Sequence, residues 1–297
     1  MRQLVANLPL IVDERLARHT SWRVGGPARY YLETSDAALL QAALAWAQTE
    51  ALPTFLLGGG TNLLVRDTGF PGLVLRYTAR TWQLEGAGEQ ALLRVDAGAP
   101  LAGTARRLCT QGWAGLEWAE GLPGTVGGAV FGNAGCYGGD LAHGLNRAWL
   151  LAAGNTVVWS CAQLGYGYRT SVLKQARGTS NQPIILAAEI RLVRADPREL
   201  AAIIERTAAE RKAKTPLGRS CGSVFQNPPG QSAGRLIEAA GLKGHRVGAA
   251  EISPRHANYI VNHGGASSDD LLALIEIVRS EVLRQFGIEL ALEVQVL

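Results

Sequence analysis

Long apolar stretches are missing from this sequence of 297 residues. No run reaches the roughly 20 consecutive apolar residues that a membrane-spanning helix needs. The first residues, Met1-Arg2-Gln3-Leu4, do not lead into an apolar segment that ends in a small-residue cleavage site, as a secretion signal would. We therefore expect a cytoplasmic protein with no membrane partner.

Cysteine and histidine are scarce and scattered. The four cysteines form no C-x-x-C pair and the five histidines form no H-E-x-x-H motif; the cysteines are Cys109, Cys136, Cys161 and Cys221. Zinc sites and redox dithiols need such closely spaced ligands. We therefore expect free thiols in a reducing compartment and no metal.

Charged residues make up only 18% of the chain and leave a net charge of +4. The basic residues are dispersed, apart from a concentration at Arg211, Lys212, Lys214 and Arg219. Because a nucleic-acid-binding protein usually gathers such residues into a stripe, we expect no nucleic-acid partner. A small anionic ligand such as a diphosphate agrees with this concentration at least as well. A solvated basic surface agrees with it too.

The hydrophobic fraction of 47% is typical of a globular protein, and the length exceeds one ordinary core, so two or three subdomains are expected. Helical spacing predicts helices over residues 36–49 with Ser35 as N-cap, 101–111, 197–214 with Asp196 as cap, 233–240 and 269–286. Apolar runs predict strands over residues 54–57, 63–65, 73–75, 92–95, 148–151, 156–159, 184–193 and 289–297. This mixture indicates an α+β fold rather than repeated βαβ units.

Two glycine-rich segments are candidate ligand loops. The first, Gly58-Gly59-Gly60-Thr61-Asn62, directly follows a predicted strand. Its main-chain N–H groups can approach phosphate oxygens, although it matches neither a dinucleotide fingerprint nor a Walker loop. Taken alone, a plain connection between two strands explains it better.

The second segment, residues 120–139, is richer in glycine and is predicted to form an irregular binding loop. So much glycine costs conformational entropy, which a bound diphosphate could offset by holding the loop in place. A glycine-rich turn packed on itself is the alternative.

Three polar residues are candidates for chemistry. Arg169 presents a planar fork that suits a carboxylate, but an arginine in such a segment is usually solvated. Ser223 lies in no nucleophile elbow, so it is a proton donor or a structural serine. Glu293 lies in the predicted last strand on the face opposite Leu292 and Val294, where a carboxylate can also be simply exposed.

Taken together and in order, these segments resemble the UDP-N-acetylenolpyruvoylglucosamine reductase family. The resemblance runs from about Thr20 to the end of the chain and favours the shorter class of members. The matching segments are residues 19–26, 58–67, 121–139, 168–171, 222–228, 241–244 and 256–262, and Glu293. Cys221 departs from the alanine that the family often has in this motif, while Ser223 is retained.

The resemblance implies the FAD-binding fold shared with vanillyl-alcohol oxidase, in two α+β subdomains, plus a C-terminal α+β substrate domain. We expect residues 1–79 with 290–297 in the first subdomain, 80–194 in the second, and 195–289 in the substrate domain. It further implies non-covalent FAD and NADPH as cofactors, a UDP-sugar enolpyruvate as small-molecule substrate, and a monomer.

Residue roles are carried over from the matching motifs. FAD is expected at Gly58, Gly59, Gly60, Thr61, Asn62, Gly121, Pro123, Gly124, Thr125, Gly127, Gly128 and Asn133. Substrate contacts are expected at Tyr168, Asn227, Lys243, His256 and Asn258. Catalytic roles are expected for Arg169, Ser223 and Glu293.

Two other functions stay open on the sequence. Related folds serve flavin oxidases, often with covalently attached flavin, for which Cys136 would be the candidate. A protein that binds a nucleotide sugar without catalysis is the second. An oxidase accounts less well for Arg169, Ser223 and Glu293.

Overall fold

The computed structural model describes residues 2–5, 7–86, 88–178 and 182–297. The chain divides into two compact units, each built from separate stretches. Unit 1 comprises Met1–Val12, Tyr30–Gly59 and Gly72–Arg211, and unit 2 comprises Asp13–Arg29, Gly60–Pro71 and Lys212–Leu297. In the part of the chain that the structure describes, no helix is long and apolar enough to cross a membrane.

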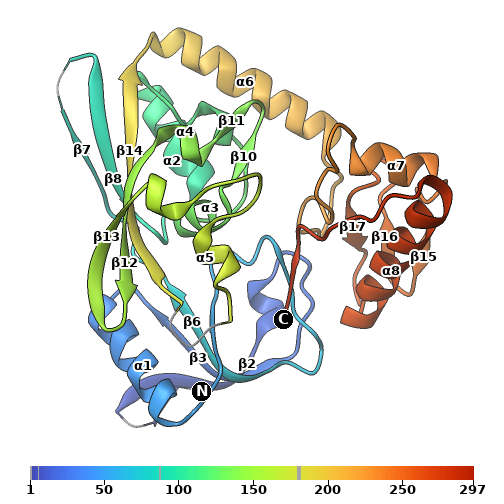
Figure 1. Ribbon diagram of the computed structural model, residues 1–297, viewed down its shortest axis with the longest axis horizontal. Helices are drawn as coiled ribbons and strands as arrows, with labels where there is room; N and C mark the ends of the chain where they lie inside the picture. The colour runs from blue at the N-terminus through green and yellow to red at the C-terminus, as the bar shows by residue number, and fades with distance from the viewer. Residues whose placement is uncertain (1, 6, 87, 179–181) are drawn as a thin grey trace. The chain divides into compact units, whose positions relative to one another are not determined.

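A five-stranded sheet lies near the N-terminus, in the order β1-β2-β3-β6-β4 (Figure 1). Its strands are β1 (Arg2–Val5), β2 (Leu8–Arg15), β3 (Pro27–Thr34), β6 (Phe70–Tyr77) and β4 (Thr54–Leu56). The sheet packs on helix α1 (Ala37–Thr49), whose Leu40, Ala43 and Ala47 are buried. The N-cap of α1 is Asp36, not Ser35 as expected, because the Asp36 carboxylate accepts from the Ala38 N–H at 2.8 Å.

A second sheet forms the centre of unit 1, in the order β13-β12-β14-β8-β7, with β9 pairing β14. Its strands are β7 (Trp82–Glu85), β8 (Gln90–Asp96), β9 (Trp113–Ala114), β12 (Leu145–Ala152), β13 (Asn155–Ser160) and β14 (Ile184–Arg194). Helix α2 (Leu101–Thr110) buries Leu101, Ala105 and Leu108 against this sheet (Figure 1). The predicted strands and helix of this region are confirmed.

The glycine-rich stretch 121–139 is not irregular throughout, so that prediction is wrong. It contains helix α3 (Val126–Gly132) and the hairpin of β10 (Gly135–Cys136) and β11 (Gly139–Asp140). Helix α3 forms because Val126, Ala129 and Val130 are buried in the core of unit 1, and tertiary packing outweighs the poor helix propensity of glycine.

The remaining elements of unit 1 are short, apart from the long helix α6. These are η2 (Glu117–Ala119), α4 (Leu141–Gly144), η3 (Ala162–Leu164), α5 (Val172–Gln175) and α6 (Pro197–Lys214), the last continuing into unit 2. The predicted capping of α6 is confirmed, since the Asp196 carboxylate accepts from the Arg198 N–H at 2.8 Å.

Unit 2 is built around helix α8 (Ser268–Phe286) and a three-stranded sheet in the order β15-β16-β17. Its other elements are η1 (Leu16–His19), β5 (Leu63–Leu64), α7 (Ala233–Ala239), β15 (Arg246–Val247), β16 (Ala250–Ile252), β17 (Ile260–Asn262) and β18 (Gln295–Val296). Leu271, Leu274 and Val278 of α8 pack with Phe225 and Ile252 in its core.

The end of the chain is extended but is not one long strand, as its alternation predicted. Only β18 forms a ladder, parallel to β5, and Leu292 makes an isolated bridge with Phe225. Ala291 and Glu293 bond to the loop at residues 224–226 instead of to a strand, so regular strand pairing does not extend to them.

Candidate functional site

The two predicted flavin loops meet at Thr125 in unit 1. The Thr125 hydroxyl caps α3 by accepting from the Gly128 N–H at 3.2 Å. A Cβ built on Gly58 would lie 3.3 Å from the same oxygen, and one on Gly128 would lie 3.6 Å from it. The two loops therefore present glycine main chain side by side, which is a surface that suits a diphosphate.

Other glycines of these loops are required by close packing. Gly127, the second residue of α3, lies against Ala97, whose Cβ would lie 2.9 Å from a Cβ at position 127. Gly60, in unit 2, has φ +64°, and a Cβ there would overlap the carbonyl oxygen of His19. The Gly127 N–H also donates to the Ala97 carbonyl at 2.8 Å, so the loop is held from within the protein.

Two charged groups beside the second loop were not predicted as site residues, although the sequence placed Arg211 in a basic concentration that agrees with a diphosphate. Glu120 is only 1% exposed and receives a forked pair of hydrogen bonds from Arg106 of α2. The Arg211 side chain lies against Gly121, where a Cβ would approach its Cδ to 2.8 Å. The position of Glu120 directly before a glycine-rich loop was the sequence feature that could have identified it. No local pattern links Arg211 to Gly121.

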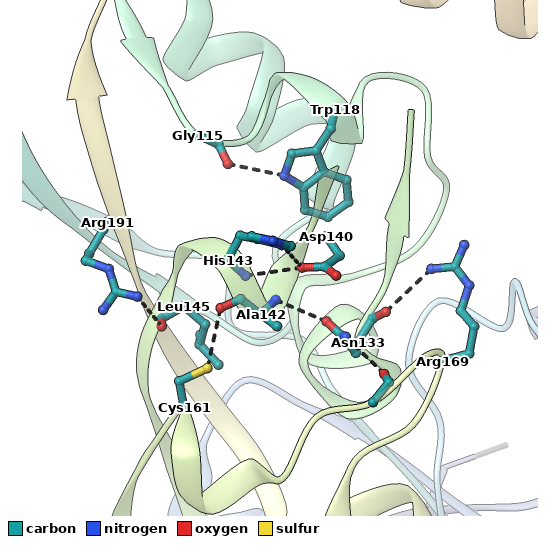
Figure 2. Close-up of polar contacts among 11 residues, drawn as sticks. Gly115, Trp118, Asn133, Asp140, Ala142, His143, Leu145, Cys161, Arg169 and Arg191 are labelled. Carbon is teal, nitrogen blue, oxygen red and sulfur yellow. Dashed lines mark hydrogen bonds and ion pairs between the residues drawn. The ribbon is translucent and has the colours of Figure 1, made fainter. Parts of the chain in front are cut away.

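Arg169 lies in a tight turn of unit 1, between Gly167 and Thr170, which exchange main-chain hydrogen bonds of 3.2 and 3.3 Å. Its guanidinium donates to the carbonyl oxygen of Asn133 (Figure 2) and to that of Gly135. Tyr168, the other central residue of the turn, is 57% exposed and lies beneath the guanidinium at 5.6 Å. The turn thus presents an exposed aromatic ring next to an anchored cation.

Ser223 and Glu293 are held together in unit 2 by their neighbours. The Glu293 N–H donates to the Val224 carbonyl at 2.8 Å, and the Gln226 N–H donates to the Ala291 carbonyl at 2.9 Å. Asn62 reaches the same place, because its side-chain amide donates to the Glu293 carbonyl at 3.1 Å. A hydroxyl-bearing and a carboxylate-bearing segment therefore lie side by side.

Cys221 is buried next to this pair. Burial, reinforced by the Glu293 carboxylate, raises the pKa of the Cys221 thiol well above its usual range. The thiol therefore stays protonated and unreactive.

The predicted substrate residues of unit 2 differ in how they are bound. The buried Asn258 side chain bonds the main chain of Phe225 at both atoms, at 2.9 and 2.8 Å. Asn227, which is exposed, accepts from the Ala233 N–H at the start of α7 at 3.0 Å. The Lys243 ammonium pairs with the Glu238 carboxylate at 2.6 Å. Their substrate roles stay predictions.

His256 accepts the Asn258 N–H at its Nδ1 atom at 3.2 Å, and its ring packs on Tyr259 at 4.7 Å. Burial lowers the pKa of His256 below its ordinary value. The imidazole is therefore neutral near pH 7, and its proton lies on Nε2.

Cys136 is the residue on which covalent flavin attachment would depend. Its thiol donates to the Trp118 carbonyl at 2.9 Å. Burial raises the pKa of Cys136, although Arg211 and Arg169 oppose this. A protonated thiol is a poor nucleophile, which disfavours attachment there.

Two family models match this chain. The model "FAD binding domain" matches residues 28–158, and "UDP-N-acetylenolpyruvoylglucosamine reductase, C-terminal domain" matches residues 211–297. The fold and these matches define the class: an α+β flavoprotein with a reductase-type C-terminal domain, as the sequence predicted.

Relatives match over nearly the whole length. The chain is 59% identical to UDP-N-acetylenolpyruvoylglucosamine reductase of Chloroflexus aggregans, over 98% of this chain and 99% of that protein. It is 44% identical to the Rubrobacter xylanophilus enzyme of the same name, over 96% and 94%. The crystal structure of the Thermus caldophilus enzyme matches with a TM-score of 0.82 at 35% identity, covering 97% and 99%. The chain belongs to the UDP-N-acetylenolpyruvoylglucosamine reductase family.

Proposed function

We propose that this protein reduces UDP-N-acetylglucosamine enolpyruvate to UDP-N-acetylmuramate with NADPH, in the synthesis of peptidoglycan precursors. Family membership over the full length supports the reaction. The observation that supports the chemistry is the main-chain pairing of the segments that carry Ser223, the proposed proton donor, and Glu293, the proposed polarising group.

FAD fits the surface formed by Gly58, Thr125 and Gly128, where two glycines without side chains lie beside the Thr125 hydroxyl. The loops 58–62 and 121–128 would hold its diphosphate and ribityl chain, with Asn133 beside them. When bound, FAD supplies the hydride chemistry, from NADPH to the CH2 carbon of the enolpyruvyl group.

The residues of this chain then handle charge and the proton. The Arg169 fork binds the substrate carboxylate, where negative charge develops as the hydride arrives. Glu293 assists by polarising that group. Ser223 donates a proton to the carbon next to the carboxylate, which completes the addition of hydride and proton across the double bond.

Tyr168, Asn227, Lys243, His256 and Asn258 are proposed to contact the UDP-sugar. The division into subdomains 1–79 with 290–297 and 80–194, and a substrate domain 195–289, is part of the same proposal. So are a monomeric state and a cytoplasmic location, where NADPH and nucleotide sugars occur.

Rapid-mixing kinetics of the two half-reactions test the proposal. NADPH is expected to bleach the flavin of the purified protein without oxygen, and the enolpyruvate is expected to restore its absorbance within one turnover. In an oxidase, the reduced flavin would be reoxidised by oxygen alone, and the enolpyruvate would not change its absorbance. A protein that only binds the nucleotide sugar would show no flavin reduction.

A further inference from the structure

The end of helix α3 fastens the turn that carries Arg169. The last carbonyl groups of a helix have no partner within it. Here the Tyr166 hydroxyl donates to the Val130 carbonyl at 2.8 Å, and the Ser171 hydroxyl donates to the Phe131 carbonyl at 2.6 Å. The turn is thus attached at both ends to the helix that begins in the second flavin loop.

Asn133, the C-cap of α3, lies between these two attachments. Its side chain accepts from the Ala142 N–H through Oδ1 at 3.0 Å and donates through Nδ2 to the Gly167 carbonyl at 3.1 Å (Figure 2). A flipped amide would oppose donor to donor and acceptor to acceptor, so the orientation is fixed. The residue is 5% exposed, and it joins three segments of unit 1.

The backbone at both residues needs support from its surroundings. Asn133 has φ +46° and Arg169 has φ +55°, and neither is glycine. A left-handed backbone is unfavourable for a residue with a Cβ, although asparagine tolerates it better than most, and at Arg169 it persists because neighbouring contacts enforce it. Asn133 supplies one such contact at Gly167, the residue that closes the turn around Arg169.

Asn133 also contacts the functional end of Arg169. Its carbonyl oxygen accepts from Nη1 of the guanidinium at 3.5 Å, while Nη2 donates to the Gly135 carbonyl. Asn133 therefore holds the turn that carries Arg169 and also supplies one of the carbonyl oxygens that bind the guanidinium.

We infer that Asn133 is a positioning residue for Arg169, in addition to lying near the predicted cofactor loops. The inference rests on the proposed carboxylate-binding role of Arg169. The amide of Asn133 acts through Arg169, so removing the amide weakens binding of the substrate carboxylate.

Asn133→Gly tests this, because glycine accepts the left-handed backbone and the variant removes only the side chain. We expect flavin reduction by NADPH to keep its rate and flavin reoxidation by the enolpyruvate to slow about 10²-fold, since a displacement of about 1 Å can cost that much. The dissociation constant of the enolpyruvate, measured by its perturbation of the flavin spectrum, should rise at least tenfold. The dissociation constant of UDP should not change.

Asn7→Gly is the matched control, because Asn7 is an exposed asparagine of unit 1 that also has a positive φ, +66°. It should leave all these quantities unchanged. If Asn133→Gly does not fold, Asn133→Asp serves in its place, since it keeps the acceptor for Ala142 but sets a carboxylate oxygen against the Gly167 carbonyl.

A double-mutant cycle with Arg169→Lys decides whether Asn133 acts through the arginine. Residues that act as a unit give non-additive losses, so the double variant should be little slower than Arg169→Lys alone. Additive losses, or an Asn133→Gly variant with normal reoxidation, overturn the inference. So does a variant whose only defect is weaker FAD binding by the apoprotein. If Arg169→Lys itself is fully active, the proposed role of Arg169 fails first, and that result is distinct from a failure of Asn133 alone.

Discussion

At the scale of single residues, asparagine side chains in both units bond to main chain near the proposed catalytic groups. Asn62 holds the Glu293 carbonyl, Asn133 holds Gly167, and Asn258 holds Phe225. An asparagine amide offers both a donor and an acceptor, so it can replace the main-chain partner that an irregular segment lacks. These contacts show how loops without regular pairing can present Arg169, Ser223 and Glu293 in defined places.

Ser223→Ala should separate the two half-reactions. Removing the hydroxyl takes away the proton donor, and general acids contribute typically about 10²–10⁴-fold, so reoxidation of the flavin by the enolpyruvate should slow by that factor. Flavin reduction by NADPH should keep its rate, because no proton from Ser223 is involved. Rapid-mixing absorbance measurements give both rates. A loss of less than tenfold in reoxidation would mean that Ser223 is structural.

His256 should make the stability of the protein depend on pH. Its folded-state pKa is lowered by burial, so below about pH 6.5 the unfolded chain binds the proton more readily than the folded protein does. This contribution therefore favours folding at pH 7 to 8 and is lost progressively as the pH falls below about 6.5. The advantage of the wild type over His256→Gln in urea midpoint should shrink between pH 8 and pH 5.5. A constant difference across that range would show that His256 does not titrate in this way.

At the scale of elements, α3 connects the predicted flavin surface to the Arg169 turn. Thr125 caps its start and faces Gly58, while the carbonyl groups at its end accept from Tyr166 and Ser171. The predicted flavin surface and the Arg169 turn therefore both depend on one short helix that lies against the central sheet of unit 1.

Two glycines of α3 provide a matched pair of substitutions. Gly127→Ala sets a Cβ 2.9 Å from the Ala97 Cβ and 3.1 Å from its carbonyl oxygen, so strand or helix must shift. We expect a loss of about 1–3 kcal/mol in stability together with weaker FAD binding.

Gly132→Ala lies in the same helix, and among the described residues no atom outside its chain neighbours and its own helix backbone lies within 4 Å of the new Cβ, so it should stabilise the protein by about 0.5–1 kcal/mol. Urea unfolding and FAD titration of the apoprotein check both variants. Equal behaviour of the two would contradict the packing argument.

At the scale of the whole molecule, the flavin loops and the catalytic candidates are distributed over both units. Gly58, Thr125 and Arg169 belong to unit 1, whereas Gly60, Asn62, Ser223 and Glu293 belong to unit 2. The matched family models, at residues 28–158 and 211–297, likewise account for the flavin part and the reductase part separately.

The flavin should be held without a covalent bond. Acid precipitation of the purified yellow protein is expected to release all the flavin into the supernatant, because the protonated and half-buried Cys136 is a poor nucleophile. Absorbance of pellet and supernatant at the flavin maximum measures the outcome. Flavin retained on the denatured chain would favour the oxidase alternative, and loss of that retention in Cys136→Ser would identify the attachment site.

Much of the fold and of the family followed from the sequence, because local patterns carry them. Helical patterns predicted α8 and also α6 with its Asp196 cap, and apolar runs predicted β8, β12 and β14. The order of the glycine-rich and polar motifs pointed to the family, which the full-length relatives confirm. Each of these helices, strands and motifs depends on residues within a few positions of one another. The sequence by itself therefore determined them.

Tertiary structure decided what depends on distant partners. Helix α3 is poor in helix propensity and exists because its apolar residues are buried against strands β8 and β14, which are distant from it in sequence. The alternation at the end of the chain predicted one long strand, but only β18 pairs with a strand, β5, whereas Ala291 and Glu293 bond to the loop after Ser223. Asn133 was expected to bind the cofactor because its segment resembles the family's motif. Only the fold shows that its amide joins Ala142 to Gly167, because that contact requires three separate segments to be packed together.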